Sequence, residues 1–202
     1  MSSNRVHPVA LALAAFAVGL LVSTFSHAEE TTATAPPVTG GYAGPEMKVS
    51  TLAGDAVLLA GGQAGWILAD SIVIGGAGYA TVTDVIPPLS LQAPGGNARL
   101  GLGYGGVRMG GILAPKQRVH GAFGLLIGGG MAYSATRDES FRRHDRFVVV
   151  EPAVEVEANV VRHVRVALGG GYRFVGNTEE PGFLPMRLSG PSAMLVFRFG
   201  EL

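Results

Sequence analysis

Strict alternation of apolar and polar residues is the feature that most constrains what this chain can fold into. From Arg162 to Val175, valine, leucine and aromatic residues recur at every second position, with arginine, histidine and glycine between them. The run from Val148 to Val160 repeats the pattern with glutamate on the polar side. Because successive side chains of a β-strand point to opposite faces, both runs predict strands with one apolar and one polar face.

Eight such runs follow one another along the chain, and no helical period is sustained after residue 46. The predicted strands are Glu46 to Leu52, Ala56 to Leu68, Ser71 to Thr83, Ala98 to Met109, Arg118 to Tyr133, Arg146 to Asn159, His163 to Val175 and Leu188 to Gly200. Apart from the first connection, short and long connections alternate. An even number of strands, with lengths near the ~9 to 11 residues that cross a bilayer, predicts an all-β fold, an eight-stranded antiparallel up-and-down transmembrane β-barrel.

The distribution of charge decides which face of this barrel points inward. The charged residues share a face with most of the 31 glycines, and only 15% of the residues are charged. A narrow lumen needs small residues beside bulky charged ones, whereas a charge placed in lipid costs about 2 to 4 kcal/mol. We therefore predict an ion-paired network in the lumen, with a proton or ion path as the alternative. Its predicted members are Glu151, Glu155, Glu157, His163, Arg165 and Arg173.

The hairpin of the sixth and seventh strands gives this network a testable register. A three-residue turn at Val160 to Arg162 would place Glu157 opposite Arg165 and Asn159 opposite His163. Aromatic residues near the strand ends are predicted to form girdles at the two membrane interfaces. They are Trp66 and Phe199 near the short turns, and Tyr79, Tyr133, Tyr172 and Phe174 near the long loops.

The first residues have the three-part layout of a secretory signal peptide. Arg5 precedes an apolar run from Val9 to Val22, and Ser26-His27-Ala28 places small residues before a cleavage point. The alternative is an uncleaved anchor. We predict a signal peptide at residues 1–28, a flexible arm rich in Thr, Pro and Gly at residues 29–45, and the barrel at residues 46–202. The expected location is the bacterial outer membrane, after export through the inner membrane and cleavage of the signal.

Composition removes several classes of function. Fifteen basic residues balance fifteen acidic ones, which argues against electrostatic capture of nucleic acid. The chain has no cysteine, so it has no thiolate metal site.

The predicted loop from Thr136 to Asp145 carries Arg137, Arg142 and Arg143, which could contact lipopolysaccharide phosphates. Nearby acidic residues make a simply solvated loop the alternative.

Histidine placement argues against catalysis. A lipid deacylase of this architecture needs its base on the lipid-facing exterior near the outer rim, with a serine in reach. His120 and His163 are predicted to face inward near the short turns, and His144 is predicted in a long loop. We therefore predict no catalytic, cofactor-binding or metal-binding residues and no cofactor.

Three stretches resemble a family of small, functionally uncharacterised bacterial outer-membrane β-barrel proteins. They are Gly61 to Asp84, Phe147 to Gly176 and Leu188 to Gly200, spread over five of the eight strands. The resemblance implies an eight-stranded barrel in the outer membrane and no assigned reaction. Such barrels usually end on an aromatic residue that the insertion machinery reads, whereas Gly200-Glu201-Leu202 follow Phe199 here.

These observations predict a non-enzymatic outer-membrane barrel with a structural or loop-mediated binding role in the cell envelope. The alternative is a narrow pore or a lipid-modifying outer-membrane enzyme. The expected partners are outer-membrane lipid, lipopolysaccharide and the outer-membrane assembly machinery, with no nucleic acid. The expected oligomeric state is a monomer.

Overall fold

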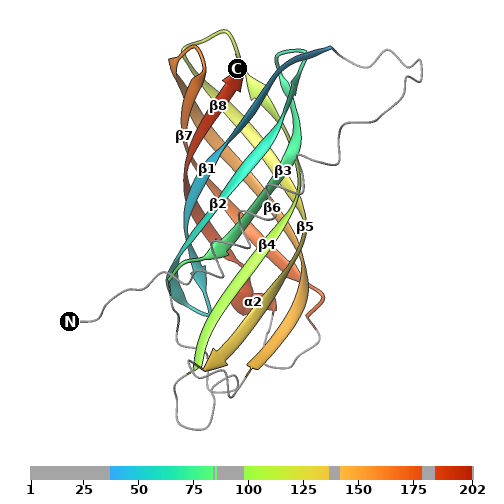
Figure 1. The fold of residues 1–202 in the computed structure, drawn as a ribbon, viewed down its shortest axis with the longest axis vertical. Coiled ribbons are helices and arrows are strands. Elements are labelled where there is room, and N and C mark those ends of the chain that lie inside the picture. Colours follow the sequence, from blue (N-terminus) through green and yellow to red (C-terminus); the bar gives the residue numbers. More distant parts are fainter. Residues whose placement is uncertain (1–36, 84, 86–97, 137–141, 179–184, 202) are drawn as a thin grey trace, which may run out of the picture.

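The fold is a closed barrel of eight antiparallel strands in sequence order, with β8 paired to β1 (Figure 1). The computed structural model describes residues 37–83, 85, 98–136, 142–178 and 185–201. Its elements are β1 (Val38–Leu52), β2 (Asp55–Leu68), β3 (Ile72–Thr81), β4 (Ala98–Leu113), β5 (Val119–Thr136), β6 (Arg142–Val161), β7 (Val164–Gly176), α2 (Pro185–Leu188) and β8 (Gly190–Glu201). The predicted all-β, eight-stranded, up-and-down architecture is confirmed.

β1 begins earlier than expected. Residues 38–45, which we placed in the flexible arm, are strand. Gly41 pairs with Trp66 of β2 on one side and with Glu201 of β8 on the other. A shorter β1 would leave unpaired backbone groups on both neighbours, which a closed barrel in lipid does not tolerate. This strand was not predicted because residues 38–45 are rich in Gly and contain Pro, and both residue types usually indicate a loop rather than a strand. The predicted signal peptide lies outside the described residues.

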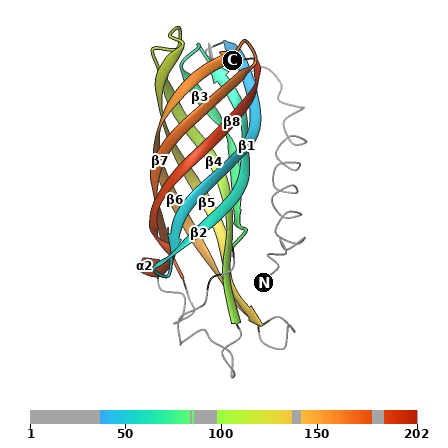
Figure 2. The same ribbon diagram turned by 90° about the vertical axis from the view of Figure 1, so that its left-hand side faces the viewer.

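The two ends of the barrel differ. Both views place α2 at the end opposite to the C-terminus (Figures 1 and 2). We call the end with α2 the loop end, because the connections β3–β4, β5–β6 and β7–β8 lie there, and the other end the turn end. The β1–β2 connection at the loop end is only Ala53-Gly54, with φ values of 55° and 99°. Two positive φ values are what a two-residue hairpin turn of type I′ requires.

The β6–β7 turn is also shorter than predicted. It contains Arg162 and His163, and a bulge interrupts the register between Asn159 and Val161. As a result Asn159 faces Arg165 and Glu157 faces Ala167. The predicted pairs of Glu157 with Arg165 and of Asn159 with His163 are therefore wrong as directly opposed residues, by a two-residue shift.

The assignment of the two faces is confirmed. On β6 and β7, Val154 is 66% exposed and Leu168 is 64% exposed, while Glu155 and Arg165 are buried in the interior. No helix in the described ranges is long and apolar enough to span a bilayer.

Of the aromatic residues predicted to form the interface girdles, Tyr79 is the one that does not lie on the outer surface. It is 3% exposed and lies inside the barrel, because odd-numbered residues of β3 face inward.

The interior near the loop end is mostly apolar, although Ser134, Asp145 and Arg173 are also buried there. One cluster of buried side chains fills it, and we call this set the apolar cluster: Leu52, Val57, Leu59, Ala77, Tyr79, Val85, Leu100, Leu102, Tyr104, Leu126, Ala132, Phe147, Val149, Val175 and Leu188. α2 contributes Leu188, and Ala53 donates its backbone N–H to the Arg187 carbonyl at 2.7 Å. The short helix thus packs against the loop end next to β7 and β1 and adds Leu188 to the apolar cluster, which we had not predicted.

Candidate functional site

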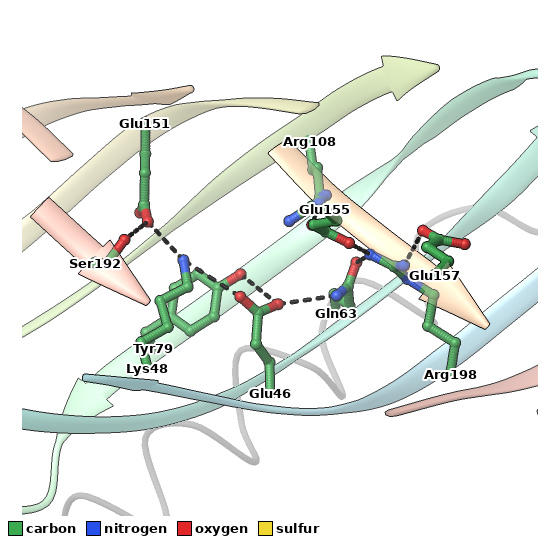
Figure 3. Close-up of polar contacts among 10 residues, drawn as sticks. All are labelled: Glu46, Lys48, Gln63, Tyr79, Arg108, Glu151, Glu155, Glu157, Ser192 and Arg198. Atoms are coloured by element: carbon green, nitrogen blue, oxygen red, sulfur yellow. Dashed lines mark hydrogen bonds and ion pairs between the residues drawn. The ribbon is translucent and has the colours of Figure 1, made fainter. Parts of the chain in front are cut away.

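The middle of the lumen holds charged and polar side chains, and Lys48 lies at the centre of one part of them (Figure 3). Its Nζ is 2.7 Å from Glu151 Oε1 and 3.4 Å from Glu46 Oε1. The same ammonium lies 3.6 Å from the ring centroid of Tyr79. The Tyr79 hydroxyl donates to Glu46 at 2.9 Å, and that of Tyr104 donates to Glu151 at 2.7 Å. Both carboxylates are therefore paired with the cation and held by phenol donors.

Arg198 organises the second part, closer to the turn end (Figure 3). It forms ion pairs with Glu155, at 2.5 Å, and with Glu157. Arg108 pairs with Glu155 from the other side, so this carboxylate lies between two guanidinium groups. Glu157 also accepts from His120 at 3.1 Å and lies 3.7 Å from Arg165.

Gln63 joins the two parts into one network. Its Nε2 donates to Glu46 at 2.8 Å, and its Oε1 accepts from Arg198 at 3.3 Å. We call the joined set the lumen network, and its members come from all eight strands: Glu46, Lys48, Gln63, Tyr79, Tyr104, Arg108, His120, Glu151, Glu155, Glu157, Arg165, Ser192 and Arg198. Four carboxylates face four Lys or Arg cations, so the set is self-neutralising apart from the state of His120.

The structure brings together part of the predicted lumen set. Glu151, Glu155, Glu157 and Arg165 lie in the lumen network. His163 does not, because the shorter turn leaves it exposed at the turn end. Arg173 is completely buried inside the barrel, but its side chain donates to the carbonyls of Leu188 and Thr51, both at 2.8 Å. Its observed hydrogen bonds therefore hold the loop end, while its guanidinium lies 5.6 Å from the ring centroid of Tyr104, a member of the lumen network. Direct pairing of Arg173 with the carboxylates stays a prediction.

Sequence reasoning missed most of the cations that neutralise the glutamates. Lys48, Arg108 and Arg198 lie on β1, β4 and β8, whereas we looked for partners on the adjacent strand β7. The signal was present, since each of the three alternates with apolar neighbours in its own strand. The β6 glutamates with which they pair lie across the lumen, and a pattern read one strand at a time does not show pairing across the barrel.

A small cavity borders the lumen network at the turn end. It has a volume of about 20 Å³, and Tyr42, Arg108, Glu157, Arg165 and Arg198 contribute to its lining. The Nε of Arg165 is buried and has no hydrogen-bond partner within the described structure. A cavity of this size with several polar walls has room for a water molecule but not for an organic substrate.

The three histidines in the described residues occupy three different environments. His120 is buried, with its ring nitrogens near the Gln117 carbonyl and Glu157. His163 is exposed at the turn end. His144 belongs to β6 and points outward near the loop end, so the prediction that it lies in a loop is wrong. Its outward neighbours on β5 and β6 are Tyr133 and Arg146, and no Ser or carboxylate occupies the outward positions described beside it.

The predicted phosphate-binding arginines are only partly described. Arg137 lies outside the described residues. Arg142 and Arg143 belong to β6, because β5 and β6 extend further than predicted, and the Arg143 side chain is exposed. Within the described ranges, no group of three or more His, Asp or Glu side chains has the arrangement of a metal site.

Comparison with known proteins supports the fold. No family model matches the chain. No curated protein matches it either. Among solved structures, Neisserial surface protein A (NspA) is similar with a TM-score of 0.59 and 11% identity, over 81% of this chain and 96% of that one. At this identity the likeness shows a shared barrel fold.

Two further solved structures match less well. Ail, the attachment invasion locus protein of Yersinia pestis, has a TM-score of 0.46 and 13% identity, over 80% of this chain and 96% of that one. The outer-membrane protease OmpT of Escherichia coli has a TM-score of 0.30 and 14% identity, over 85% of this chain and 98% of that one.

Proposed function

We propose that this chain is a bacterial outer-membrane barrel that does not conduct, with a structural or loop-mediated binding role in the envelope. The exterior supports the membrane location. Large apolar side chains such as Val154, Val156, Leu168 and Phe174 are more than half exposed there. Charged residues at described outward strand positions occur only near the strand ends. A surface of this kind suits lipid, whereas a soluble barrel would present charge to water.

The filled lumen is the observation that carries the non-conducting role. The lumen network crosses the barrel through side chains from every strand, and the apolar cluster fills the space between it and α2. An ion would have to displace paired charges and then cross a closely packed, mostly apolar layer. This arrangement weighs against the alternative of a narrow pore.

The loop end supports a binding role more than a catalytic one. α2 is held there by Arg173 and by the Ser189 hydroxyl, which accepts from the Val175 N–H at 3.0 Å and donates to the Pro185 carbonyl at 2.8 Å. A rigid barrel that presents long connections at one end is a common scaffold for recognition. His144 faces outward as a lipid-modifying base would, but it lacks a described nucleophile beside it.

Planar bilayers test this proposal directly. Purified full-length protein should migrate differently on a detergent gel before and after boiling, because a closed barrel resists detergent. In planar bilayers the same preparation should show no unitary conductance above that of protein-free membranes. A porin reconstituted in parallel is the positive control. Regular conductance steps from heat-modifiable protein would contradict the sealed lumen.

Two further measurements complete the test. Fractionation should find the chain in the outer membrane, and recovery from the soluble periplasm would contradict the location. Incubation with phospholipid and lipopolysaccharide should release no fatty acid. Release that His144→Ala abolishes would support the enzymatic alternative instead.

A further inference from the structure

The charged residues on the outward positions of the strands are not evenly distributed. At the loop end, the described outward side chains of Arg, Lys, His, Asp or Glu are Arg99 of β4 and His144 and Arg146 of β6. None of them is acidic, and Asp145, which lies between His144 and Arg146, is buried on the inward side. Although the whole chain is neutral, the described outward positions on this side of the rim are therefore basic.

Strand register places these residues around one aromatic ring. Tyr133 of β5 is directly opposite His144 on β6 and Gly101 on β4. A Cβ at Gly101 would lie 2.5 Å from the Tyr133 ring, so the glycine leaves room for the ring to lie across β4. One step toward the turn end, Met131 is opposite Arg146, and one step toward the loop end, Ala135 is opposite Arg99. We call Arg99, Tyr133, His144 and Arg146 the basic rim.

The basic rim lies just beyond the apolar band. Val160 and Val148 of β6 are both about half exposed and mark the two ends of its apolar outward run. Their twelve-residue separation corresponds to roughly 30 Å along the axis of a barrel with tilted strands, close to the ~25 Å apolar band of such barrels. Arg146 is the next outward residue after Val148. Its guanidinium therefore lies at the level of lipid headgroups.

On the turn-end side of the basic rim, the outer surface of the barrel is apolar. Met131 and Ile127 on β5 and Val148 on β6 are each more than 40% exposed and apolar. Cations next to an apolar surface are complementary to a lipid, whose phosphate headgroup would contact the cations and whose acyl chains would cover the apolar surface. A free phosphate would use only the cations. Building on the proposed membrane location, we infer that the basic rim binds the phosphate of an anionic lipid in the outer leaflet.

Lipid titration of the purified, detergent-folded full-length protein tests this inference. Native mass spectrometry would compare diphosphorylated lipid A with the same lipid after removal of its phosphates, and inorganic phosphate would be added as a competitor. We expect the phosphorylated lipid to bind at least about tenfold more tightly, since two charge-assisted contacts are involved. The double variant His144→Gln, Arg146→Gln should lose about tenfold in affinity, and Arg146→Lys should retain most of it.

The matched control is Arg162→Gln, which removes an exposed arginine at the turn end and should leave lipid affinity unchanged. Equal binding of both lipids, equal affinity of the wild type and the double variant, or full competition by millimolar inorganic phosphate would overturn the inference. If the double variant does not fold, the comparison of the two lipids on wild-type protein still decides the outcome. Protein that shows the gel shift but no lipid preference contradicts this inference alone, whereas protein without the shift contradicts the proposed function.

Discussion

The two halves of the lumen are enclosed by the same closed sheet but are filled by different kinds of side chain. At the loop end, apolar side chains such as Leu59, Leu102 and Val149 have almost no exposure and share one cluster with Leu188 of α2. Toward the turn end, the lumen network replaces them with paired charges such as Glu155 and Arg198. Apolar packing tolerates small shifts, whereas a buried charge tolerates no missing partner. The polar half therefore constrains strand register more tightly than the apolar half.

The largest expected effect is in the polar half. Glu155→Ala leaves Arg108 and Arg198 buried without the carboxylate between them. We expect the free energy of unfolding to fall by about 4 kcal/mol, because an unpaired buried charge costs more than a lost contact. Urea unfolding in lipid vesicles measures this loss. Asp70→Asn, which removes an exposed carboxylate in the β2–β3 turn, is the control, and a similar loss there would contradict the explanation.

A cavity in the apolar half should cost somewhat less. Leu102→Ala removes a fully buried side chain from the apolar cluster and should lower the free energy of unfolding by about 3 kcal/mol. Leu168→Ala on the lipid face is the matched substitution, and its loss should be smaller because acyl chains fill the space. Equal losses at the two leucines, from the same urea titration, would indicate that the loop-end interior is not tightly packed.

Removing the hydrogen bonds that Arg173 makes to α2 and β1 should lower the free energy of unfolding by less than either change above. Arg173→Met keeps the length of the side chain but removes both donors to the Leu188 and Thr51 carbonyls. We expect a loss of about 2 kcal/mol and faster proteolysis of the β7–β8 connection, since two buried acceptors lose their partner. Arg173→Lys should recover part of the loss. Unchanged proteolysis in Arg173→Met would show that this side chain does not hold the helix.

The smallest effect is expected at Arg165, at the edge of the polar half. Its contact with Glu157 is 3.7 Å long, and Glu157 keeps Arg198 and His120 when the arginine is removed. Arg165→Ala should therefore cost only about 1 kcal/mol. A double-mutant cycle with Glu157→Ala should give a coupling energy below about 1 kcal/mol. Coupling of several kcal/mol would mean that this pair is as important as Arg108 with Glu155.

The sequence by itself determined the strand number, the up-and-down order and the assignment of faces. Alternation along a strand is a local property, so Val154 outward and Glu155 inward could be predicted from β6 alone. The presence of charged interior residues followed from the same alternation. Local turn chemistry was less informative, and the β6–β7 turn was predicted one residue too long, which misplaced His163.

Only the tertiary structure decided which side chains meet. Glu155 lies between Arg108 of β4 and Arg198 of β8, two strands that do not adjoin β6, and closure of the barrel brings them together across the lumen. The same closure converts the Gly-rich residues 38–45 into strand, because both neighbours of β1 need partners. Strand register and barrel radius set these distances, and both arise from all eight strands at once rather than from any one of them.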